Sequence, residues 1–397
     1  MNSRSSAIRD QIPELGLKEY WHPGVLASKV GKRPVGMKML GEDLVFFRGK
    51  DGEVVAATNT CPHRGGSLMH GDCHYPGTIA CPYHGWVFDG DGECLAVLSE
   101  GPDSHMPGEV RLRIYPTRTL KGLVFVWMGE AKPVPVEDDV PPEFFEDDGT
   151  MLFISVRDWA VNWRGALENG MDSHVMYVHR NALLSLMEPI QHFGPVGYYP
   201  KVVNDRAVIG YLKDPPGSRK QYFPALGDTW PRTEWRRLWL WAFAWRMRPG
   251  PPFHPDDPEW GMNAKVDGRY VRAAGHHLPA MFRFDFGGQM YTRFCVAVTA
   301  DLTRVFYVHA SRRRGRLGRT LRALYYHGFR NWALNINFSS QDYRVMKTQD
   351  YTAPEMLSTS DAEIVQWRRL LLRARGMPQA PRAAEGETEA AQRSAAE

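Results

Sequence analysis

The stretches Cys61-Pro-His63 and Cys81-Pro-Tyr-His84 decide which fold we expect for this chain. Each stretch brings one cysteine and one histidine close together, and thiolate sulfur and imidazole nitrogen both bind soft or borderline metal ions. A structural zinc ion with two cysteines and two histidines is one candidate occupant. Zinc-binding pairs, however, usually have roughly two to four residues between the ligands, and only Pro62 separates Cys61 from His63. The spacing therefore favours a metal centre of another kind.

A two-iron cluster explains the spacing better than a single ion. In a Rieske [2Fe–2S] centre one iron takes two cysteines and the other takes two histidines, so each loop supplies one ligand to each iron. Gly65, Gly66 and Gly85 flank the two motifs, and glycine allows backbone N–H groups to approach the bridging sulfides. We predict a Rieske cluster with four ligands, namely Cys61, His63, Cys81 and His84.

The other three cysteines fit no such pattern. Cys73 has no histidine at the motif spacing, and we expect Cys94 and Cys295 to be packed thiols. Five cysteines in a long chain argue against a disulfide framework and favour a reducing cytoplasm.

Composition adds limits on the function classes. The 397 residues, at roughly 150 per domain, predict two or three domains. A hydrophobic content of 43% and a charged content of 24% are ordinary for a globular protein, and the net charge of +4 does not favour nucleic acid or a membrane surface. No apolar run approaches the roughly 20 residues of a membrane span, and the polar residues 1–16 do not resemble a signal peptide.

The first third of the chain is typical of a small β-sandwich or barrel. Short apolar runs separated by glycine-rich turns occur at 43–48, 53–57, 86–88 and 123–127. Residues 132–150 are rich in Pro, Asp and Glu and predict a linker. Residues 195–310 look largely β and contain many aromatic side chains.

Helical patterns occur in two places. Residues 159–180 have helical spacing, and the chain becomes helical again from Arg319. Ser360-Asp-Ala-Glu363 predicts a capping box that begins a helix, with Gly376 as its end. The apolar side chains expected on one face of that helix are Ile364, Trp367 and Leu371. Residues 377–397 lack apolar periodicity and are expected to be disordered.

A second candidate metal site lies in residues 162–179, which contain Asp172, His174 and His179. Two histidines and a distant carboxylate form the ligand triad of non-heme Fe(II) oxygenases. On an ideal helix these histidines would be about 140° apart, so a wide turn or a π-bulge is required for both to reach one ion. Taken alone, they could also be ordinary hydrogen-bonded histidines.

The chain resembles the terminal oxygenase (alpha) subunits of the Rieske non-heme iron oxygenases, and it looks most similar to the carbazole-dioxygenase type. The resemblance covers about residues 15–375 and rests on residues 61–64, 81–86, 168–179 and 360–368. It implies an α+β fold in which an all-β Rieske domain precedes a helix-grip-like catalytic domain of antiparallel sheet and helices. We place the Rieske domain at 17–131, the catalytic domain at 132–376 plus 1–16, and the disordered tail at 377–397.

The resemblance also implies roles for individual residues. His174 and His179 would bind a mononuclear Fe(II), with Asp342 as the carboxylate ligand and Asp350 as the reserve choice. Asp172 resembles the carboxylate that bridges a cluster histidine to an iron histidine across a subunit interface. Asn169 matches a position near the iron in the family.

The spacing at Asp172 departs from the family pattern. Many relatives have two residues between this aspartate and the first histidine, whereas only Ser173 separates Asp172 from His174. The departure affects the placement of His174 and the role of Asp172, and leaves His179 in place.

Three other features have ordinary alternatives. Adjacent residues of a strand point to opposite faces, so we do not expect His276 and His277 to bind one ion together. The basic residues from Arg312 to Arg322 could dock an acidic ferredoxin, although a solvated surface is the more common outcome. The tryptophans expected in packing or in an apolar pocket are Trp230, Trp235, Trp239, Trp241 and Trp245.

The function implied by the resemblance is that of a ring-hydroxylating enzyme. It would use O₂ and electrons from a ferredoxin or a flavin reductase to hydroxylate a small apolar aromatic or polycyclic substrate, by dioxygenation or monooxygenation. Its cofactors would be one [2Fe–2S] cluster and one mononuclear Fe(II), in a homotrimer where each cluster feeds the iron of a neighbour. The alternatives left open are an O- or N-demethylase, an electron carrier without oxygenase activity, and a zinc-stapled binding protein.

Overall fold

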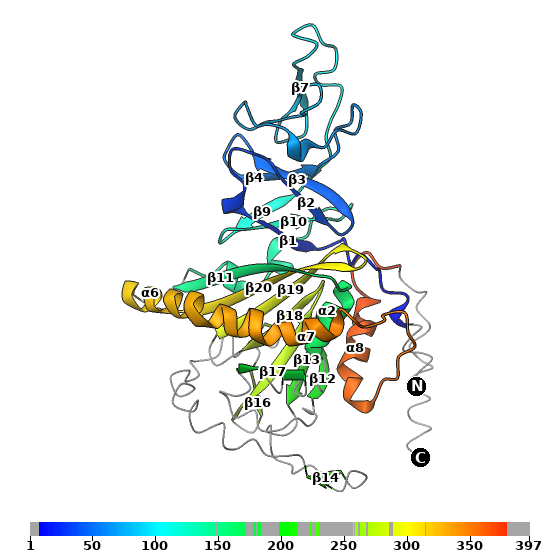
Figure 1. Ribbon diagram of the computed structural model, residues 1–397, viewed down its shortest axis with the longest axis vertical. Coiled ribbons are helices and arrows are strands. Elements are labelled where there is room, and N and C mark those ends of the chain that lie inside the picture. Colours follow the sequence, from blue (N-terminus) through cyan, green and yellow to red (C-terminus); the bar gives the residue numbers. More distant parts are fainter. Residues whose placement is uncertain are drawn as a thin grey trace.

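Strands dominate the computed structural model of the chain (Figure 1). It describes residues 8–147, 149–171, 178–179, 182–183, 198–212, 222–223, 228–229, 257, 259–260, 263–266, 269–285, 289–313 and 315–378. An N-terminal group of short strands packs on one face of a large antiparallel sheet, and helices cover the other face. This arrangement confirms the α+β fold class expected from the sequence.

The N-terminal strands form three small sheets. Their strand orders are β1-β10-β9, β2-β3-β4-β8 and β5-β6-β7. The strands are β1 (Trp21–Leu26), β2 (Val35–Met39), β3 (Glu42–Arg48), β4 (Val54–Thr58), β5 (Ile79–Ala80), β6 (Trp86–Phe88), β7 (Cys94–Val97), β8 (Ile114–Tyr115), β9 (Thr117–Leu120) and β10 (Leu123–Trp127), with short 3₁₀ turns η1 (Ala27–Lys29) and η2 (Leu68–His70). The strands expected at 43–48, 53–57, 86–88 and 123–127 are confirmed, and β3–β4 and β6–β7 pair as antiparallel hairpins.

Strand β3 lies between the two hydrophobic cores of this region. Leu44 and Phe46 face the core shared with the large sheet, whereas Val45 and Phe47 face the core beneath the cysteine loops. All four side chains are fully buried. A strand that is covered on both faces needs a continuous apolar run, and residues 44–47 provide one.

The large sheet has the strand order β11-β20-β19-β18-β17-β13-β12, and β16 pairs with β17 outside this path. Its strands are β11 (Thr150–Trp159), β12 (Tyr198–Val203), β13 (Ala207–Leu212), β16 (Asn263–Val266), β17 (Arg269–His277), β18 (Met281–Asp285), β19 (Gln289–Thr299) and β20 (Leu302–Arg312); β14 (Tyr222–Phe223) and β15 (Asp228–Thr229) form a separate pair. In β19, Phe294 and Val296 face the N-terminal strands, whereas Tyr291 and Cys295 face the helices. The alternation of a strand therefore builds one core on each side of the sheet.

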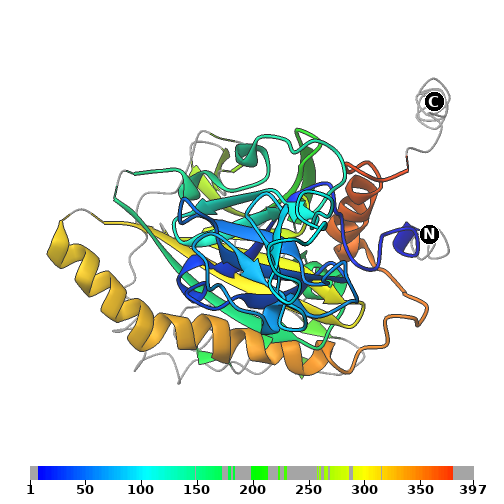
Figure 2. The same cartoon turned by 90° about the horizontal axis from the view of Figure 1, so that it is seen from above.

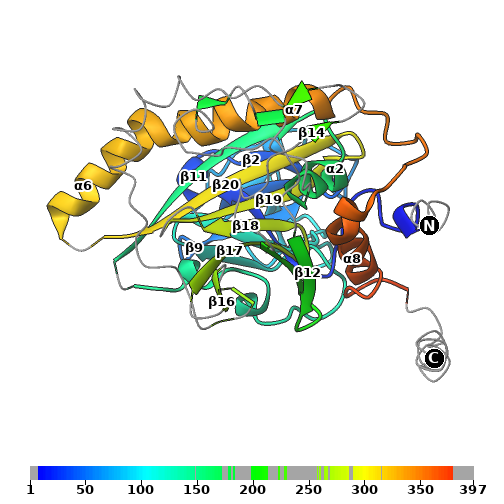
Figure 3. The same cartoon turned by 90° about the horizontal axis from the view of Figure 1, so that it is seen from below.

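The helices lie on the face of the sheet away from the N-terminal strands (Figures 1 and 2). They are α2 (Trp163–Glu168), α6 (Arg316–Tyr325), α7 (Ser339–Met346) and α8 (Ala362–Leu371), with the π-helical turns η10 (Tyr326–Arg330) and η11 (Trp332–Phe338) and the 3₁₀ turns η5 (Asn169–Met171) and η12 (Thr359–Asp361). The 3₁₀ turns η3 (Val136–Asp138) and η4 (Pro142–Phe144) lie on the opposite side, between the N-terminal strands and the large sheet. Figure 3 shows α8 beside β12, and α2 close to the long helix that ends in α7. Segments far apart in sequence therefore meet below the sheet.

The expected linker at 132–150 was wrong in its described part. Its turns η3 and η4 are packed, with Val136, Val140 and Phe144 in the core between the N-terminal strands and the large sheet. Two of its acidic residues, Asp139 and Glu143, are buried too. Glu143 accepts hydrogen bonds of 3.2 and 2.7 Å from Arg283 of β18. The composition resembled a linker because the partners of these acids lie far away in sequence.

The expected capping box was placed two residues too late. The box is formed by Ser358 and Asp361. The Ser358 hydroxyl accepts a hydrogen bond from a backbone N–H of the first turn, and the Asp361 carboxylate accepts one from the Ser358 N–H. Glu363 is instead buried under the sheet and contacts His276. The apolar face of α8 is confirmed, since Ile364, Trp367 and Leu371 are all buried. The predicted helix end at Gly376 was wrong: α8 ends at Leu371, and Gly376, with a φ of +78°, lies in the turn that follows.

Several expectations lie outside the described residues. These are the five tryptophans between 230 and 245 and all of the tail beyond residue 378. Cys94 and Cys295 are buried thiols, as expected. In the part of the chain that the structure describes, no helix has the length and apolar character needed to cross a membrane.

The buried pair Glu143–Arg283 yields a stability prediction. Glu143→Ala should lower the free energy of unfolding by about 3–5 kcal/mol, because a guanidinium that is 0% exposed would lose its carboxylate. The matched control is Asp158→Ala, which breaks the more exposed pair with Arg304 and should cost no more than about 1 kcal/mol. Chemical denaturation followed by fluorescence measures both. Equal losses would contradict the packed role of residues 132–150.

Candidate functional site

The two cysteine loops have the same backbone structure. The Cys61 N–H donates to the Gly66 carbonyl and the Gly65 N–H donates to the Cys61 carbonyl, at 2.8 and 2.9 Å. In the second loop the Cys81 N–H donates to the Trp86 carbonyl at 2.8 Å, and the Gly85 N–H returns to Cys81 at 3.0 Å. Gly65 and Gly85 both have positive φ, which explains why glycine occurs at this point of each turn. The chain thus builds two equivalent loops that each present a cysteine and a histidine.

The two cysteine side chains lie next to each other, and so do the two histidine side chains. The Cys61 and Cys81 thiols are buried and close enough to hydrogen-bond to each other. The imidazole rings of His63 and His84 lie 4.7 Å apart and closer to solvent. Buried Nδ1 of His84 has no hydrogen-bond partner among the described residues. A thiol pair beside an imidazole pair fits a [2Fe–2S] cluster with one Cys₂ iron and one His₂ iron.

Burial disfavours the thiolate form of Cys61 when no metal ion is bound. Burial raises the pKa of Cys61 to about 11, and the neighbouring Cys81 adds to the rise. Only the thiolate is a strong metal ligand, so cluster assembly must displace protons from this pair. Within the described ranges, no three His, Cys, Asp or Glu side chains gather as ligands of one ion.

Below the sheet, three of the predicted site residues come together. His179 and Asp342 are buried, and the histidine Nε2 lies 3.1 Å from the carboxylate Oδ1. The side chain of Asn169 donates to the same Oδ1 at 3.2 Å. Phe338 stacks on the His179 ring at a centroid distance of 3.4 Å. The site is therefore assembled from η5, the segment around residue 179, and α7.

The geometry of the contact between His179 and Asp342 suits a pair of metal ligands. Neither ring nitrogen of His179 forms a hydrogen bond with a described residue, although Asp342 is only 3.1 Å away. An imidazole nitrogen and a carboxylate oxygen that converge without hydrogen-bond geometry can both direct lone pairs toward a divalent cation. These two residues therefore fit one side of a 2-His-1-carboxylate site.

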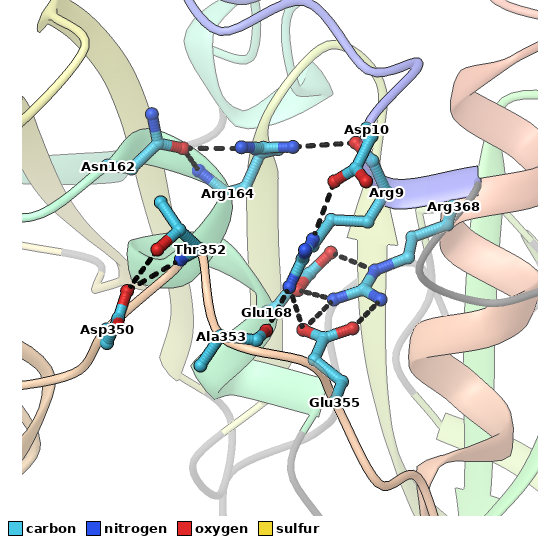
Figure 4. Close-up of polar contacts among 10 residues, drawn as sticks. All are labelled: Arg9, Asp10, Asn162, Arg164, Glu168, Asp350, Thr352, Ala353, Glu355 and Arg368. Carbon is cyan, nitrogen blue, oxygen red and sulfur yellow. Dashed lines mark hydrogen bonds and ion pairs between the residues drawn. The ribbon is translucent and has the colours of Figure 1, made fainter. Parts of the chain in front are cut away.

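The remaining predicted site residues divide into two groups. Asp172 and His174 lie outside the described residues. Asp350 is exposed and caps a turn, accepting hydrogen bonds from the N–H and the hydroxyl of Thr352 at 2.9 and 2.7 Å (Figure 4). These hydrogen bonds lower the pKa of Asp350. The surroundings of the two aspartates favour Asp342 over Asp350 as the carboxylate ligand.

A buried ion-pair network fixes the helix that leads to Asn169. Arg368 of α8 donates to Glu168 at 2.8 and 2.7 Å and to Glu355 at 2.9 Å (Figure 4). At the start of α2, Asn162 caps the helix by accepting from the Arg164 N–H at 3.0 Å. Glu168 and Arg368 both belong to motifs seen in the sequence, but only the fold shows that they pair.

Sequence reasoning missed a polar cluster that joins the π-helical turn η11 to strands β11 and β20. The Asn335 side chain bonds to His309 Nε2, Ser155 Oγ and Asn331 Oδ1 at 3.0, 3.1 and 2.9 Å. Burial lowers the pKa of His309 to about 3, so this imidazole is neutral. Asn335 lies in η11, directly before α7, and π-helical turns often occur near functional sites. The sequence of η11 has no pattern that distinguishes it from an α-helix.

His276 and His277 point to opposite faces of β17, as predicted. His276 contacts Glu363 on the helix side, whereas His277 stacks on Trp260 at 4.9 Å. Burial lowers the pKa of both histidines. In the basic segment, Arg312 forms an ion pair with Glu146, and docking of a partner there stays a prediction.

Comparison with known proteins gives two family matches. Residues 21–116 match the Rieske [2Fe-2S] domain, and residues 127–223 match the homotrimeric ring hydroxylase family. The chain is 36% identical over 173 residues to the terminal oxygenase component of carbazole 1,9a-dioxygenase from a Sphingomonas species, which is 43% of this chain and 45% of that protein. It is 32% identical over 193 residues to the oxygenase subunit of 3-chlorobenzoate-3,4-dioxygenase from Comamonas testosteroni, covering 47% and 43%. The chain thus spans less than half the length of these relatives.

Solved structures match over nearly the whole chain. The terminal oxygenase of carbazole 1,9a-dioxygenase from Novosphingobium sp. KA1 superposes with a TM-score of 0.70 at 23% identity, covering 95% of this chain and 98% of that one. A reduced complex between oxygenase and ferredoxin in carbazole 1,9a-dioxygenase gives 0.72 at 21% identity, covering 96% of each chain. At these identities the match demonstrates a shared fold.

The equivalent loops yield a prediction about the cluster. Cys81→Ser should abolish the visible absorption of the purified protein and remove about two irons and two sulfides per chain, because one iron would lose a thiolate. Cys73→Ser is the matched control, since this thiol lies between the loops but outside the four-residue set; it should retain the full content. Iron and acid-labile sulfide analysis measures the outcome. An unchanged sulfide content in Cys81→Ser would rule out the assignment.

Proposed function

We propose that this chain is an alpha subunit of the Rieske ring-hydroxylating oxygenases, the terminal oxygenase component of a multicomponent enzyme. Its N-terminal part is a Rieske [2Fe–2S] domain. The proposed reaction is the O₂-dependent hydroxylation of an aromatic or polycyclic substrate. The observation that carries the proposal is the convergence of His179, Asp342 and Asn169 in a chain that also has a Rieske domain.

The proposed ligand sets are the two described above. Cys61, His63, Cys81 and His84 would hold the cluster, and His174, His179 and Asp342 would hold a mononuclear Fe(II). Bound there, ferrous iron supplies open coordination positions for dioxygen chemistry next to the substrate. We retain 17–131 and 132–376 plus 1–16 as the proposed domain limits.

The surrounding residues have supporting roles in this proposal. Asn169 would fix the direction of the Asp342 carboxylate through their 3.2 Å hydrogen bond, leaving the second carboxylate oxygen available. Phe338 covers one face of the His179 ring and would restrict both its rotation and the access of water. Both roles require burial, and the two proposed ligands are fully or almost fully buried.

The arrangement of one chain supports electron transfer between subunits. The cysteine loops and the site around Asp342 lie on opposite sides of the large sheet, with a hydrophobic core on each face between them (Figure 1). A route through this interior is long, so we propose a homotrimer in which the cluster of one subunit serves the iron of a neighbour. Asp172 would provide the bridge between them.

The electron donor and the substrate are proposed by analogy. The carbazole 1,9a-dioxygenase oxygenase forms a complex with ferredoxin, and we propose a ferredoxin or a flavin reductase as the donor here. The relatives include dioxygenases and the oxygenase subunit of a 5,5'-dehydrodivanillate O-demethylase, so dioxygenation, monooxygenation and demethylation remain alternatives. Product analysis under labelled O₂ separates them. The five free thiols favour a cytoplasmic site of action.

The assignment of Asp342 can be tested without the substrate. Asp342→Asn should reduce the iron content from about three to about two per chain and leave the sulfide content at about two, because only the mononuclear site loses a ligand. The hydroxylation activity should disappear as well. Asp350→Asn is the matched control and should retain all three irons.

Two outcomes would contradict this proposal. A wild-type protein with two irons and no third would favour an electron carrier without oxygenase activity. If Asp350→Asn loses the third iron and Asp342→Asn retains it, the carboxylate ligand is Asp350 and the assignment of Asp342 is wrong.

A further inference from the structure

A buried pair of titratable side chains lies next to the proposed iron site. His276 of β17 and Glu363 of α8 are 0% and 3% exposed, and Nδ1 of the histidine lies 3.2 Å from Oε1 of the carboxyl group. Burial raises the pKa of Glu363 and lowers the pKa of His276, and both shifts favour the neutral form of the group. A neutral hydrogen-bonded pair can be buried at a much lower cost than an ion pair.

The pair fits between two glycines. A Cβ atom on Gly170 of η5 would lie 2.8 Å from His276 Nε2, and a Cβ atom on Gly210 of β13 would lie 2.6 Å from Glu363 Oε2. Neither glycine has a positive φ. A side chain at either position would therefore have to displace its neighbour in the pair, and the two side chains fill the gap between β13 and η5 from end to end.

One end of this pair supports the turn that carries Asn169. Gly170 is the next residue after Asn169, and it is held against both His276 and the ring of Phe282, at 2.8 and 2.9 Å from its would-be Cβ. Phe282 in turn stacks on His276 at a centroid distance of 4.9 Å. The amide of Asn169 bonds to Asp342 at 3.2 Å. A displacement of the pair is therefore transmitted through Gly170 to the carboxylate.

We propose that His276 and Glu363 are positioning residues for the proposed iron site: they seat the Asn169–Met171 turn and so set the direction in which Asn169 holds Asp342. The inference rests on the proposed function, since it assigns a purpose to a pair next to the iron. Neither side chain would touch the iron or the substrate. Hydrogen-bonded groups behind metal ligands commonly tune affinity and geometry at such sites.

The sharpest test acts at the far end of the pair. Gly210→Ala adds a methyl group that contacts Glu363. Because Gly210 lies in β13, which carries none of the proposed ligands, the substitution should act on the site only by pushing the pair toward Gly170. Gly318→Ala is the matched control, because its Cβ would meet Arg313 at an ordinary 4.0 Å. The probe is nitric oxide added to the full-length protein after reduction, which gives a ferrous mononuclear site an EPR signal separate from that of the cluster.

We expect Gly210→Ala to change the rhombic splitting of the nitric oxide signal and to weaken Fe(II) binding by about tenfold or more. The EPR signal of the [2Fe–2S] cluster should stay unchanged, and Gly318→Ala should match the wild type in both signals. If Gly210→Ala lowers the melting temperature but leaves the nitric oxide signal and the Fe(II) affinity unchanged, the pair has only a packing role and the inference is overturned.

A second pair of variants keeps the test independent of the folding of Gly210→Ala. Glu363→Gln preserves the shape and the neutral hydrogen bond to His276, so it should resemble the wild type in the nitric oxide signal and in Fe(II) affinity. Glu363→Leu has a similar size without the hydrogen bond and should show the altered signal. Identical signals in Glu363→Leu and wild type would contradict the inference.

The experiment also separates this inference from the proposed function. A wild-type protein that gives no mononuclear ferrous signal would overturn both. A wild-type signal that none of the variants changes would overturn the positioning role alone and leave the proposed oxygenase function in place.

Discussion

A carboxylate that is almost fully buried beside an imidazole is the constraint on which the lower half of this structure depends. Asp342 is 3% exposed, and its contacts in the described part of the chain are an amide from Asn169 and an imidazole from His179. An ionised carboxylate in such a place is costly unless positive charge lies close to it. The buried guanidinium of Arg293 interacts electrostatically with Asp342, and a metal ion at the site would add to this stabilisation. A divalent metal ion would also satisfy the unpaired nitrogen of His179.

The structure around Asp342 brings distant segments to one point. Helix α2 is capped by Asn162 and tied to α8 by the buried Arg368, so Asn169 emerges in a fixed direction. The π-helical turns before α7 change the rotation of that helix, and Phe338 then lies on the His179 ring. On the other side of the sheet, the repeated loop at Cys61 and Cys81 uses one glycine in each copy to complete the same turn.

The sequence was sufficient where a local pattern encodes the structure. The cysteine loops, the hairpin of β3 and β4, and the apolar face of α8 all depend on residues within a few positions of one another. It was insufficient where a residue's partner is remote. Glu143 in an acidic, proline-rich segment resembles a linker residue until Arg283 is brought next to it, more than a hundred residues later in the chain.

Glu363 illustrates the same limit at the site. Its position after Ser360 fits a local capping rule, yet the neighbouring Ser358 and Asp361 satisfy that rule first. The Glu363 side chain does not cap the helix and instead contacts His276 in the interior, a contact that no local pattern encodes. Asp342 was predicted as a ligand only by resemblance, because a lone carboxylate on a helix has no local signature.

The claim that this chain holds two separate iron centres is tested most directly by Mössbauer spectroscopy of protein reconstituted with ⁵⁷Fe. The account predicts cluster iron and a distinct high-spin ferrous species in a ratio of about two to one. A spectrum that contains cluster iron alone, in protein that has been supplied with excess Fe(II), would contradict it.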